Sequence, residues 1–314
     1  MNVQQLRYVH EVARQNLNVS DAANALFTSQ PGVSKQIRLF EEELGVDIFV
    51  RHGKRLTGIT EPGRQILAIA ERALRELANL KQVGDEFSNE TVGSLSIATT
   101  HTQARYALPQ AVKAFMARYP KVRLELHQGN PTQICEWVIG GKSDIAIATE
   151  AIDRYPDKLV MMPCHQWNHC VVAPPRHPLL KEKLLTLEAI AKYPLVTYDA
   201  EFTGRNKINQ AFAKRNLVPN VVLTAIDADI IKTYVALGLG IGLMASMAFD
   251  PEQDKKLRKL DAAHLFESST TRIGVRKDAW LRGYAYVFIE LFAPHLTRKT
   301  IEATLRGGGD DPGL

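Results

Sequence analysis

Residues 18–45, NVSDAANALFTSQPGVSKQIRLFEEELG, show the pattern of two helices joined by a tight turn. We expect the first, DAANALF, to be capped by Ser20 and to present small alanines on its inner face, where a second helix can cross closely. The segment TSQPG then interrupts the helical spacing, and Pro31 suits the first turn of a longer helix that ends at Gly45. Two helices connected in this way predict a helix-turn-helix.

The second helix has an apolar face and a polar face. Apolar residues recur at helical spacing on its inner face: Val33, Ile37, Phe40 and Leu44. Three acids at 41–43 lie toward its C-terminal end, where they repel phosphate and favour insertion into DNA by the N-terminal end. That end carries groups able to bind base edges or phosphates: Ser29, Gln30, Ser34, Lys35 and Arg38. We interpret it as a recognition helix, against the alternative of a small helical domain whose polar face is only solvated.

The next stretch, VDIFVRHGKRLTGIT at 46–60, alternates apolar and polar residues and is interrupted at RHGKR. It predicts a hairpin wing in which Arg51, Lys54 and Arg55 lie along the DNA backbone. The whole chain carries a net charge of +5, yet residues 1–90 contain 11 Lys and Arg against 12 Asp and Glu. Because bulk charge is uninformative here, the prediction of a DNA-binding domain over 1–60 rests on local arrangement.

Length and composition indicate an ordinary globular protein of two or three domains. The chain has 314 residues, of which 45% are hydrophobic and 23% charged. Its three cysteines form no CxxC pair, which disfavours a disulfide framework. The first residues resemble no secretory signal, and no apolar run approaches the roughly 20 residues needed to cross a bilayer. We therefore expect a cytoplasmic protein without a membrane segment.

Residues 61–90 predict a linker helix that associates with a second subunit. After Thr60, a suitable N-cap, EPGRQILAIAERALRELANLKQVGDEF has a broad apolar stripe with charges between its members. A helix of about 25 residues that nothing local covers needs a partner helix, and antiparallel pairing with another copy supplies one. The segment SNETVG that follows indicates a hinge.

The remainder, 91–306, predicts an α/β effector-binding domain of two lobes. Short apolar strands such as SLSIATT and SDIAIAT alternate with helical patterns, the signature of parallel sheets covered by helices. The alternation occurs twice, and the chain then returns to the first lobe through TTRIGVRKD. We therefore place lobe I at about 91–163 and 268–306 and lobe II at about 164–267. The fold resembles that of periplasmic binding proteins. Residues 307–314, GGGDDPGL, indicate a flexible tail.

The stretch ATTHTQARYALP, residues 98–109, follows a strand and opens a helix. Ligands bind at the carboxyl ends of strands in such sheets, and a helix N-terminus favours an anion. Equivalent positions elsewhere also carry hydroxyls, so we predict a cradle of neutral donors for a small oxyanion or carboxylate. Its expected members are Thr100, Thr102, Gln103, Thr132, Thr149 and Thr203. One alternative is that some hydroxyls only cap helices; another is an enzyme in which His101 activates Thr100, disfavoured because adjacent residues at a strand end point apart.

Two further patterns resemble known sites only superficially. CHQWNHC, residues 164–170, offers cysteines and histidines, but an extended chain points Cys164 and Cys170 away from His165 and His169, which disfavours zinc. GLGIG, residues 238–242, follows a helix and precedes a strand, the reverse of a dinucleotide-binding loop. We expect no catalytic residue, no cofactor and no metal.

The N-terminal 60 residues resemble the LysR-type transcriptional regulators, through the AAxxL helix, SQPxxS, the LG-like helix end and FxR…TxxG. Phe40 departs from the family, which usually has Leu followed by Glu there. The resemblance implies that Gln30, Pro31, Ser34 and Lys35 approach the DNA groove, that the wing contacts the backbone, and that the linker helix dimerises.

The resemblance extends to the branch of this family that controls sulfur assimilation and cysteine biosynthesis. It rests on the segments GSLSIATTHTQARYALP, HQGNPTQI, SDIAIATEA, FTGR and DADIIKTYVALGLGIGLMASMAFDP. The branch implies an acetylserine inducer, N- or O-acetylated, and sulfate or thiosulfate in a cleft lined by Thr100, Thr102, Gln103, Thr149 and Thr203. It also implies a homotetrameric activator that binds double-stranded promoter DNA and acts on RNA polymerase. The alternatives are a regulator of sulfonate utilisation that senses adenosine phosphosulfate and, from another class, a solute-binding protein.

Overall fold

A computed structural model describes residues 1–53, 55–88, 91–149, 155–200 and 202–307, with the backbone alone at 82, 85–88 and 203. The chain divides into two compact units, Met1–Phe87 and Ser88–Leu314. No helix among the described residues is long and apolar enough to cross a membrane. Lys54 and nearly all of the expected tail lie outside the described residues.

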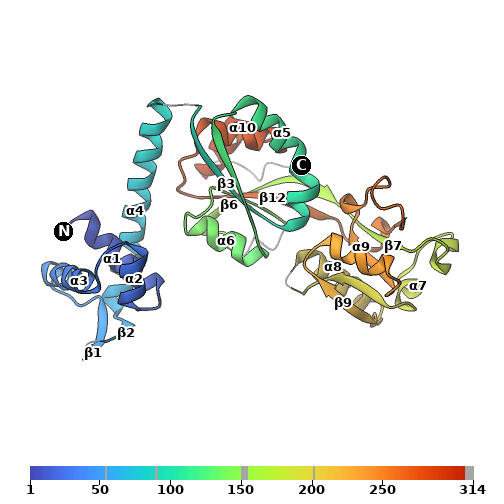
Figure 1. Cartoon of the computed structure of the whole chain (residues 1–314), viewed down its shortest axis with the longest axis horizontal. Helices are drawn as coiled ribbons and strands as arrows, with labels where there is room; N and C mark the ends of the chain where they lie inside the picture. The colour runs from blue at the N-terminus through green and yellow to red at the C-terminus, as the bar shows by residue number, and fades with distance from the viewer. Residues whose placement is uncertain (54, 89–90, 150–154, 201, 308–314) are drawn as a thin grey trace. The chain divides into compact units, whose positions relative to one another are not determined.

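The first unit is a winged helix-turn-helix followed by a long helix (Figure 1). Its elements are α1 (Val3–Arg14), α2 (Val19–Ala25), α3 (Gln30–Leu44), β1 (Phe49–His52), β2 (Arg55–Ile59) and α4 (Glu61–Ser88). Strands β1 and β2 pair antiparallel and form the wing. A single core joins the three short helices to the wing and to the start of α4, with Val33, Ile37 and Phe40 of α3 fully buried. The small Ala22 and Ala23 let α2 pack closely on its neighbours, as expected.

Two local expectations for this unit are wrong. Asn18, not Ser20, caps α2, because its side-chain oxygen accepts from the backbone N–H groups of Ser20 and Asp21. Leu44 is 38% exposed, and Glu41 takes a buried place on the inner face of α3. The expectations for Pro31 in the first turn of α3 and for Gly45 as its left-handed C-cap are confirmed.

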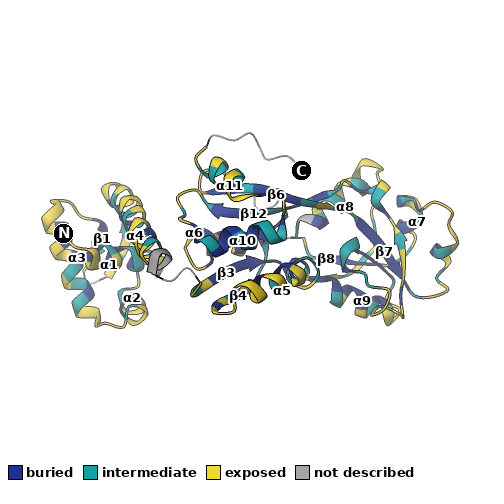
Figure 2. Ribbon diagram, turned by 90° about the horizontal axis from the view of Figure 1, so that it is seen from above, coloured by how far each residue is buried: buried dark blue, intermediate teal, exposed yellow. Residues whose placement is uncertain are grey.

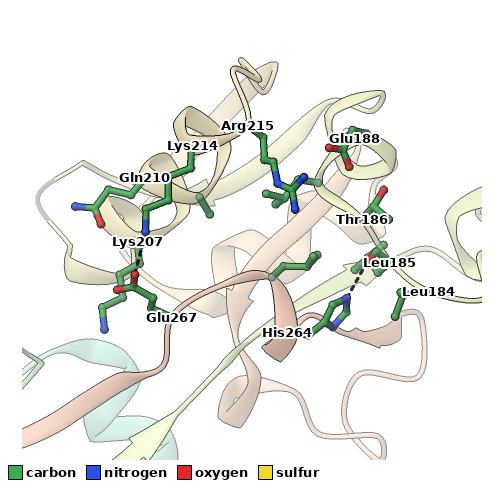
Figure 3. A pocket seen from close by; sticks show the side chains of 13 residues that line it. Leu184, Leu185, Thr186, Glu188, Lys207, Gln210, Lys214, Arg215, His264 and Glu267 are labelled. Atoms are coloured by element: carbon green, nitrogen blue, oxygen red, sulfur yellow. Dashed lines mark hydrogen bonds and ion pairs between the residues drawn. The ribbon is translucent and has the colours of Figure 1, made fainter.

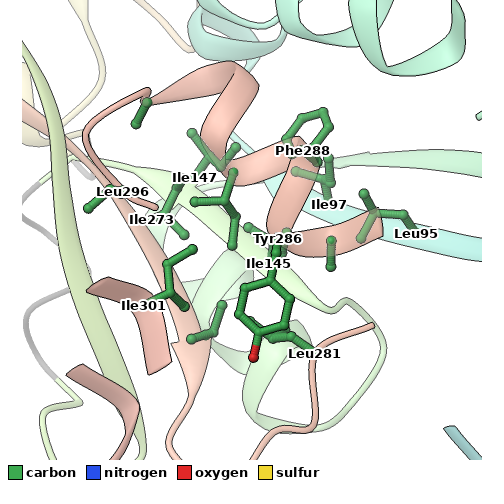
Figure 4. Packing of buried hydrophobic residues seen from close by; sticks show 14 of the residues in the cluster. Leu95, Ile97, Ile145, Ile147, Ile273, Leu281, Tyr286, Phe288, Leu296 and Ile301 are labelled. Carbon is green, nitrogen blue, oxygen red and sulfur yellow. The ribbon is translucent and has the colours of Figure 1, made fainter. Parts of the chain in front are cut away.

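The second unit begins with a five-stranded sheet, which we call the sheet of lobe I. Its strands are β3 (Gly93–Thr99), β4 (Val122–Gln128), β5 (Ile145–Ala148), β6 (Leu159–Trp167) and β12 (Ser269–Arg276), in the order β4-β3-β5-β12-β6. The strands β3, β4 and β5 are parallel, and β12 runs antiparallel to β5 and β6. The helical elements of this lobe are the π-helix η1 (Gln103–Ala107), α5 (Pro109–Arg118), α6 (Pro131–Ile139), α10 (Gly283–Phe292) and α11 (Arg298–Leu305). Ile97, Ile147 and Ile273 of the sheet pack against Phe288 of α10 in its main core (Figure 4).

A second five-stranded sheet forms lobe II. Its strands are β7 (His169–Ala173), β8 (Leu195–Tyr198), β9 (Val221–Ala225), β10 (Ile241–Ala245) and β11 (Arg258–Asp261), in the order β11-β7-β10-β8-β9. The helices are η3 (Pro178–Lys181), α7 (Leu187–Ala191), α8 (Thr203–Lys214), α9 (Ala228–Ala236), η4 (Ser246–Ala248) and η5 (Ala263–Leu265). Figure 2 shows that the central strands of both lobes are buried, whereas the helices have exposed outer faces. GLGIG connects α9 to β10, and a Cβ on Gly240 (φ +146°) would lie 2.1 Å from the Pro194 carbonyl oxygen, so this glycine serves close backbone packing.

The chain crosses between the lobes twice. The first crossover is at Asn168, because β6 stays paired with β12 as far as the Trp167–Ser269 pair and β7 starts in the other sheet at His169. The second lies between η5 and β12. The first crossover is therefore later in the sequence than the boundary expected near residue 164.

Candidate functional site

The N-terminal half of α3 presents a polar surface. Ser29, Gln30, Pro31, Lys35 and Arg38 are exposed and Ser34 is half-buried. The Ser29 hydroxyl accepts from the Gly32 N–H at 3.3 Å and caps the helix, while the Gln30 amide donates to the Ser34 hydroxyl at 3.0 Å. Among the described residues the side chains of Lys35 and Arg38 have no hydrogen-bond or ion-pair partner, so both charges are available to an external ligand.

Glu41 connects α3 to the wing. It is 5% exposed, and one carboxylate oxygen accepts from the backbone N–H groups of Ile48 at 2.8 Å and Phe49 at 3.1 Å. The other oxygen forms an ion pair with Arg51. The expectation that Glu41 is an exposed acid repelling phosphate is therefore wrong, since it satisfies the first amides of β1.

The structure describes two of the three expected wing cations, and their surroundings differ. Arg51 is partly buried, with Asp47 at 3.6 Å as a second anionic partner, so much of its charge is compensated within the unit. Arg55 is exposed at the start of β2. Lys54 lies outside the described residues. Of the two described wing cations, Arg55 is therefore the more exposed.

Phe27 is a feature of this surface that the sequence reasoning missed. It lies in the turn between α2 and α3, is 97% exposed and has a positive φ of 51°. An exposed aromatic ring held by a strained turn next to α3 is unusual for a purely structural residue. Its position in the turn, two residues before the cap Ser29, is the sequence signal that could have identified it.

The expected ligand cradle lies where strands of both sheets end. Its lining residues lie in loops and helix starts that follow β3, β4, β5 and β8, or are the last residues of β6, β8 and β10. Four members of the predicted set line it: Thr100, Thr102, Gln103 and Thr149. Six further residues complete it: Pro131, Trp167, Tyr198, Phe202, Gly204 and Ala245. None of these described lining residues is charged, and we call this space the interlobe cleft.

Thr132 is not part of the cleft. It is exposed on the first turn of α6, whereas its predecessor Pro131 is buried and lines the cavity. Successive helical residues point about 100° apart, so only one of the two can face inward. For Thr203 the structure describes the backbone, at the start of α8, and its side chain lies outside the described residues.

Several polar groups at the cleft are buried or lack a partner within the described part of the chain. The buried Gln103 amide donates to the Thr271 hydroxyl of β12 at 2.9 Å, and its carbonyl oxygen has no partner among the described residues. The Trp167 indole N–H is likewise buried without a described partner. Phe202 precedes α8 without a side-chain cap, so the first N–H groups of that helix are not satisfied by a capping side chain. The cleft therefore offers neutral donors to an anion.

Two titratable groups are neutral here: Tyr198, which lines the cleft, and His169, which packs against the lining residue Trp167. Burial raises the pKa of Tyr198 above its ordinary value, while its hydroxyl accepts from the Ala245 N–H at 3.0 Å and interacts with Thr102. Burial, reinforced by the positive charge of Lys207, lowers the pKa of His169 to about 4, against a partial opposing effect of the Gly204 backbone. His169 packs on Trp167 with ring centroids 5.1 Å apart. Both side chains thus support the cleft wall without adding charge at neutral pH.

Tyr106 ties the lobes together next to the cleft. It belongs to η1 of lobe I, yet its ring packs against the core of lobe II. Its hydroxyl donates to Asp229 of α9 at 2.6 Å and accepts from the Lys232 ammonium at 2.9 Å. Arg105 adds an ion pair to Asp229 at 2.9 Å. We call Arg105, Tyr106, Asp229 and Lys232 the interlobe latch.

Lys232 anchors the latch from the lobe II side. It is 7% exposed, and its ammonium also donates to the Ala248 carbonyl at 2.9 Å and to Asp254 at 3.1 Å. Burial lowers the pKa of Lys232, but the hydrogen bonds to Tyr106 and Asp254 more than offset it, so the pKa is raised overall. The lysine is charged and fully coordinated.

Metal-binding residue types do not form an open site among the described residues. Cys164 and Cys170 belong to different sheets, and burial raises the pKa of each thiol to about 12. His101, Asp227 and Asp229 bring ligand atoms within 4.8 Å of one another. However, Asp227 caps α9 through the Ile230 N–H, and Asp229 is neutralised by the latch cations. We assign no metal to these groups.

Both parts of the chain match models of known families. Residues 3–64 match the bacterial regulatory helix-turn-helix protein, lysR family, and residues 88–297 match the LysR substrate binding domain. The chain is 56% identical to the HTH-type transcriptional regulator SsuR of Burkholderia cenocepacia, with 98% of this chain and 99% of SsuR covered. It is 55% identical to CysB of the same organism, covering 98% of each, and 50% identical to Cbl of Escherichia coli, covering 93% and 92%.

Solved structures of LysR-family proteins are similar to this chain as well. The cofactor-binding domain of the Cbl transcriptional regulator is 45% identical, with a TM-score of 0.66, covering 69% of this chain and 95% of that one. Full-length OxyR from Pseudomonas aeruginosa, 20% identical with a TM-score of 0.67, shares the fold over 93% of this chain and 97% of its own. SsuR, CysB and Cbl are all named as HTH-type transcriptional regulators. The chain belongs to the LysR family of helix-turn-helix transcriptional regulators.

Proposed function

We propose that this regulator activates sulfur-assimilation and cysteine-biosynthesis genes in response to an acetylserine inducer bound in the interlobe cleft. The observation that carries the proposal is a cleft at the ends of strands from both sheets whose described lining is uncharged and rich in hydroxyl, amide and indole donors. Such a site selects a small anion by hydrogen bonding. The relatives named CysB support the sulfur regulon.

DNA binding is assigned to the N-terminal half of α3 and the wing. Gln30, Ser34, Lys35 and Arg38 suit the major groove, Ser29 and Pro31 shape the helix start, and Arg55 suits the phosphate backbone. Lys54 keeps its proposed role as a second wing cation. Arg51 is proposed as a minor contact, because Glu41 and Asp47 already compensate its charge.

The size of the cleft separates two kinds of ligand. Its cavity measures about 40 Å³, space for roughly three water molecules. That space suits sulfate or thiosulfate, whereas N-acetylserine and O-acetylserine are larger and need the lobes to separate slightly. We therefore assign the inorganic anions to the conformation described here and the acetylserines to a more open one.

The interlobe latch gives this difference a route to the rest of the protein. A ligand that favours the open conformation must work against the contacts of Tyr106 with Asp229 and Lys232. The resulting displacement of one lobe changes the spacing of DNA-binding heads in an assembly. The signal is thus a shift between conformations, and the ligand leaves unchanged.

Assembly into a homotetramer, a dimer of dimers, is part of the proposal. The linker helix α4 exposes Ile69 (56%), Leu77 (39%) and Leu80 (67%), the apolar stripe expected of an unpaired dimerising helix. Around the edge strand β9, Val222, Ile226 and Leu237 are exposed as well. We place the protein in the cytoplasm, with promoter DNA, inducer and RNA polymerase as its partners.

A second candidate is a regulator of sulfonate utilisation that responds to adenosine phosphosulfate. It is favoured by relatives named SsuR and Cbl, which match this chain about as well as CysB does. A nucleotide requires far more lobe opening than acetylserine. A thermal-shift screen of the full chain against N-acetylserine, O-acetylserine, sulfate, thiosulfate and adenosine phosphosulfate decides between the two. The main proposal requires stabilisation by an acetylserine, and stabilisation by adenosine phosphosulfate alone favours the second.

A further inference from the structure

A second cavity lies in lobe II and shares no lining residue with the interlobe cleft. It measures about 480 Å³ and is bounded by α7, the second half of α8 and η5 (Figure 3). That volume falls within the range of about 300–1,000 Å³ that is usual for small-molecule sites. We propose that it binds a small monocarboxylate with an apolar chain.

The floor of this cavity is apolar. Leu185 and Leu187, 4% and 6% exposed, belong to the core of lobe II, and Leu265 packs against the same core. His264 holds the loop carrying Leu185 in place through a contact of 2.8 Å between its Nε2 and the Leu185 carbonyl oxygen. An aliphatic chain that covers this floor removes apolar surface from water.

One cation at the cavity is uncommitted. Lys214 pairs with Glu267 at 3.1 Å, and Lys207 donates to the Ser268 carbonyl. The Arg215 guanidinium, by contrast, has no hydrogen-bond or ion-pair partner among the described residues, although it lines the cavity. Figure 3 shows it reaching into the space between the Lys214–Glu267 pair and the segment of Leu185 and Thr186. Its planar donors match a carboxylate in a bidentate pair.

The acids of the rim limit the charge of the ligand. Glu188 is exposed at the start of α7, and Glu267 faces the cavity from the opposite side. The lining carries three cations, Lys207, Lys214 and Arg215, against these two carboxylates, so its net charge of +1 matches a monoanion better than a dianion such as sulfate. The cavity therefore differs in chemistry from the uncharged interlobe cleft, and the helix α8 extends from one to the other, from Gly204 to Lys214.

The test uses the full chain and three probes: hexanoate, hexan-1-ol and sulfate. Saturation-transfer difference NMR titrations measure the apparent Kd of each probe for the wild type and for Arg215→Gln. Arg118→Gln, an exposed arginine of α5 outside the cavity, is the matched control, and Thr100→Val reports on the interlobe cleft.

We expect saturable hexanoate binding to the wild type, Arg118→Gln and Thr100→Val, weakened roughly tenfold or more in Arg215→Gln. Hexan-1-ol should bind at least tenfold more weakly than hexanoate, and sulfate should not compete. The proposal is overturned if hexanoate does not saturate, if Arg215→Gln binds it as the wild type does, or if Thr100→Val is the variant that loses it. Sulfate binding that depends on Thr100 concerns only the interlobe cleft, so this proposal and the proposed function fail separately.

Discussion

The hydroxyl of Tyr106 in lobe I lies 2.6 Å from the carboxylate of Asp229 in lobe II, and Tyr106 follows the cleft-lining Gln103 by three residues. The same hydroxyl accepts from the buried Lys232. A contact between the lobes is therefore built on the same π-helix as a wall of the ligand cleft. π-Helical turns are often found at functional sites, and here the turn places both groups within five residues.

Tyr106→Phe removes the hydroxyl but keeps the ring. It should therefore weaken the interlobe latch while the packing of the ring against the core of lobe II is retained. If acetylserine needs the open conformation, the variant should bind N-acetylserine about fivefold more tightly. This corresponds to a loss of roughly 1 kcal/mol from the free energy that favours the closed conformation. Isothermal titration calorimetry measures this, with Tyr119→Phe in lobe I as the control. Unchanged or weaker binding by Tyr106→Phe would contradict a latch that resists opening.

Thr100→Val removes one neutral donor from the cleft at nearly constant volume. A hydrogen bond to a charged ligand contributes about 1.5–3 kcal/mol, so affinity for sulfate and N-acetylserine should fall roughly 10- to 100-fold. Thr132→Val is the matched control, because Thr132 is exposed outside the cleft. Equal affinities for the two variants would remove Thr100 from the site.

Lys35→Ala should weaken promoter binding and leave ligand affinity intact. If its ammonium contacts phosphate, the slope of log Kd against log salt should decrease by about one, and affinity should fall for all sequences alike. Fluorescence anisotropy at several salt concentrations measures both, with Lys113→Ala in the effector unit as the control. A parallel loss of ligand affinity would contradict the proposal that the first unit binds DNA and the second binds the ligand.

Glu41→Gln should loosen the wing. The amides of Ile48 and Phe49 keep only a neutral acceptor and Arg51 loses its buried partner, a cost on the order of 2 kcal/mol. Hydrogen–deuterium exchange should therefore accelerate at 46–53 while both lobes are unaffected. Glu42→Gln, the exposed neighbour, should exchange as the wild type does, and identical exchange in the two variants would refute the structural role of Glu41.

The stability of the effector unit should fall in mild acid because of His169. Its pKa is lowered from 6.5 to about 4 in the folded state, so between these values the unfolded chain binds more protons. Stability is therefore full above about pH 6.5 and is lost as pH falls toward 4, by up to about 3 kcal/mol. In His169→Phe the decline of Tm between pH 7 and 5 should be shallower than in the wild type. His52→Gln, an exposed histidine, should decline like the wild type, and an equal decline in all three proteins would argue against His169.

Local spacing is sufficient to predict the helix-turn-helix and the strand ends that form the cleft, since both follow from neighbouring residues. Thr100, Thr102, Gln103 and Thr149 are identifiable because hydroxyls and amides directly follow strands. Contacts between distant segments are not predictable in this way. Glu41 looks solvated until β1 folds back onto it, and Tyr106 and Asp229 are 123 residues apart.

The aromatic wall of the cleft escapes sequence-based prediction for a related reason. An uninterrupted strand would place Trp167 on the same face as His165 and His169, whereas the chain changes sheets at Asn168 and Trp167 lines the cavity. Thr132 is expected in the cleft because it follows a strand, although the buried neighbour Pro131 already occupies the inward position. A periodic pattern identifies the loop, and the helix phase decides which residue faces the ligand.

The most direct measurement is the affinity of the full-length protein for promoter DNA of its own sulfur-assimilation genes, as a function of N-acetylserine concentration. For the wild type we predict that both the affinity and the length of DNA protected from nuclease change with inducer. For Thr100→Val the same curves should require at least tenfold more inducer, with DNA affinity in its absence unchanged. A Thr100→Val protein that responds at the wild-type concentration, or a wild type that does not respond at all, would contradict the account.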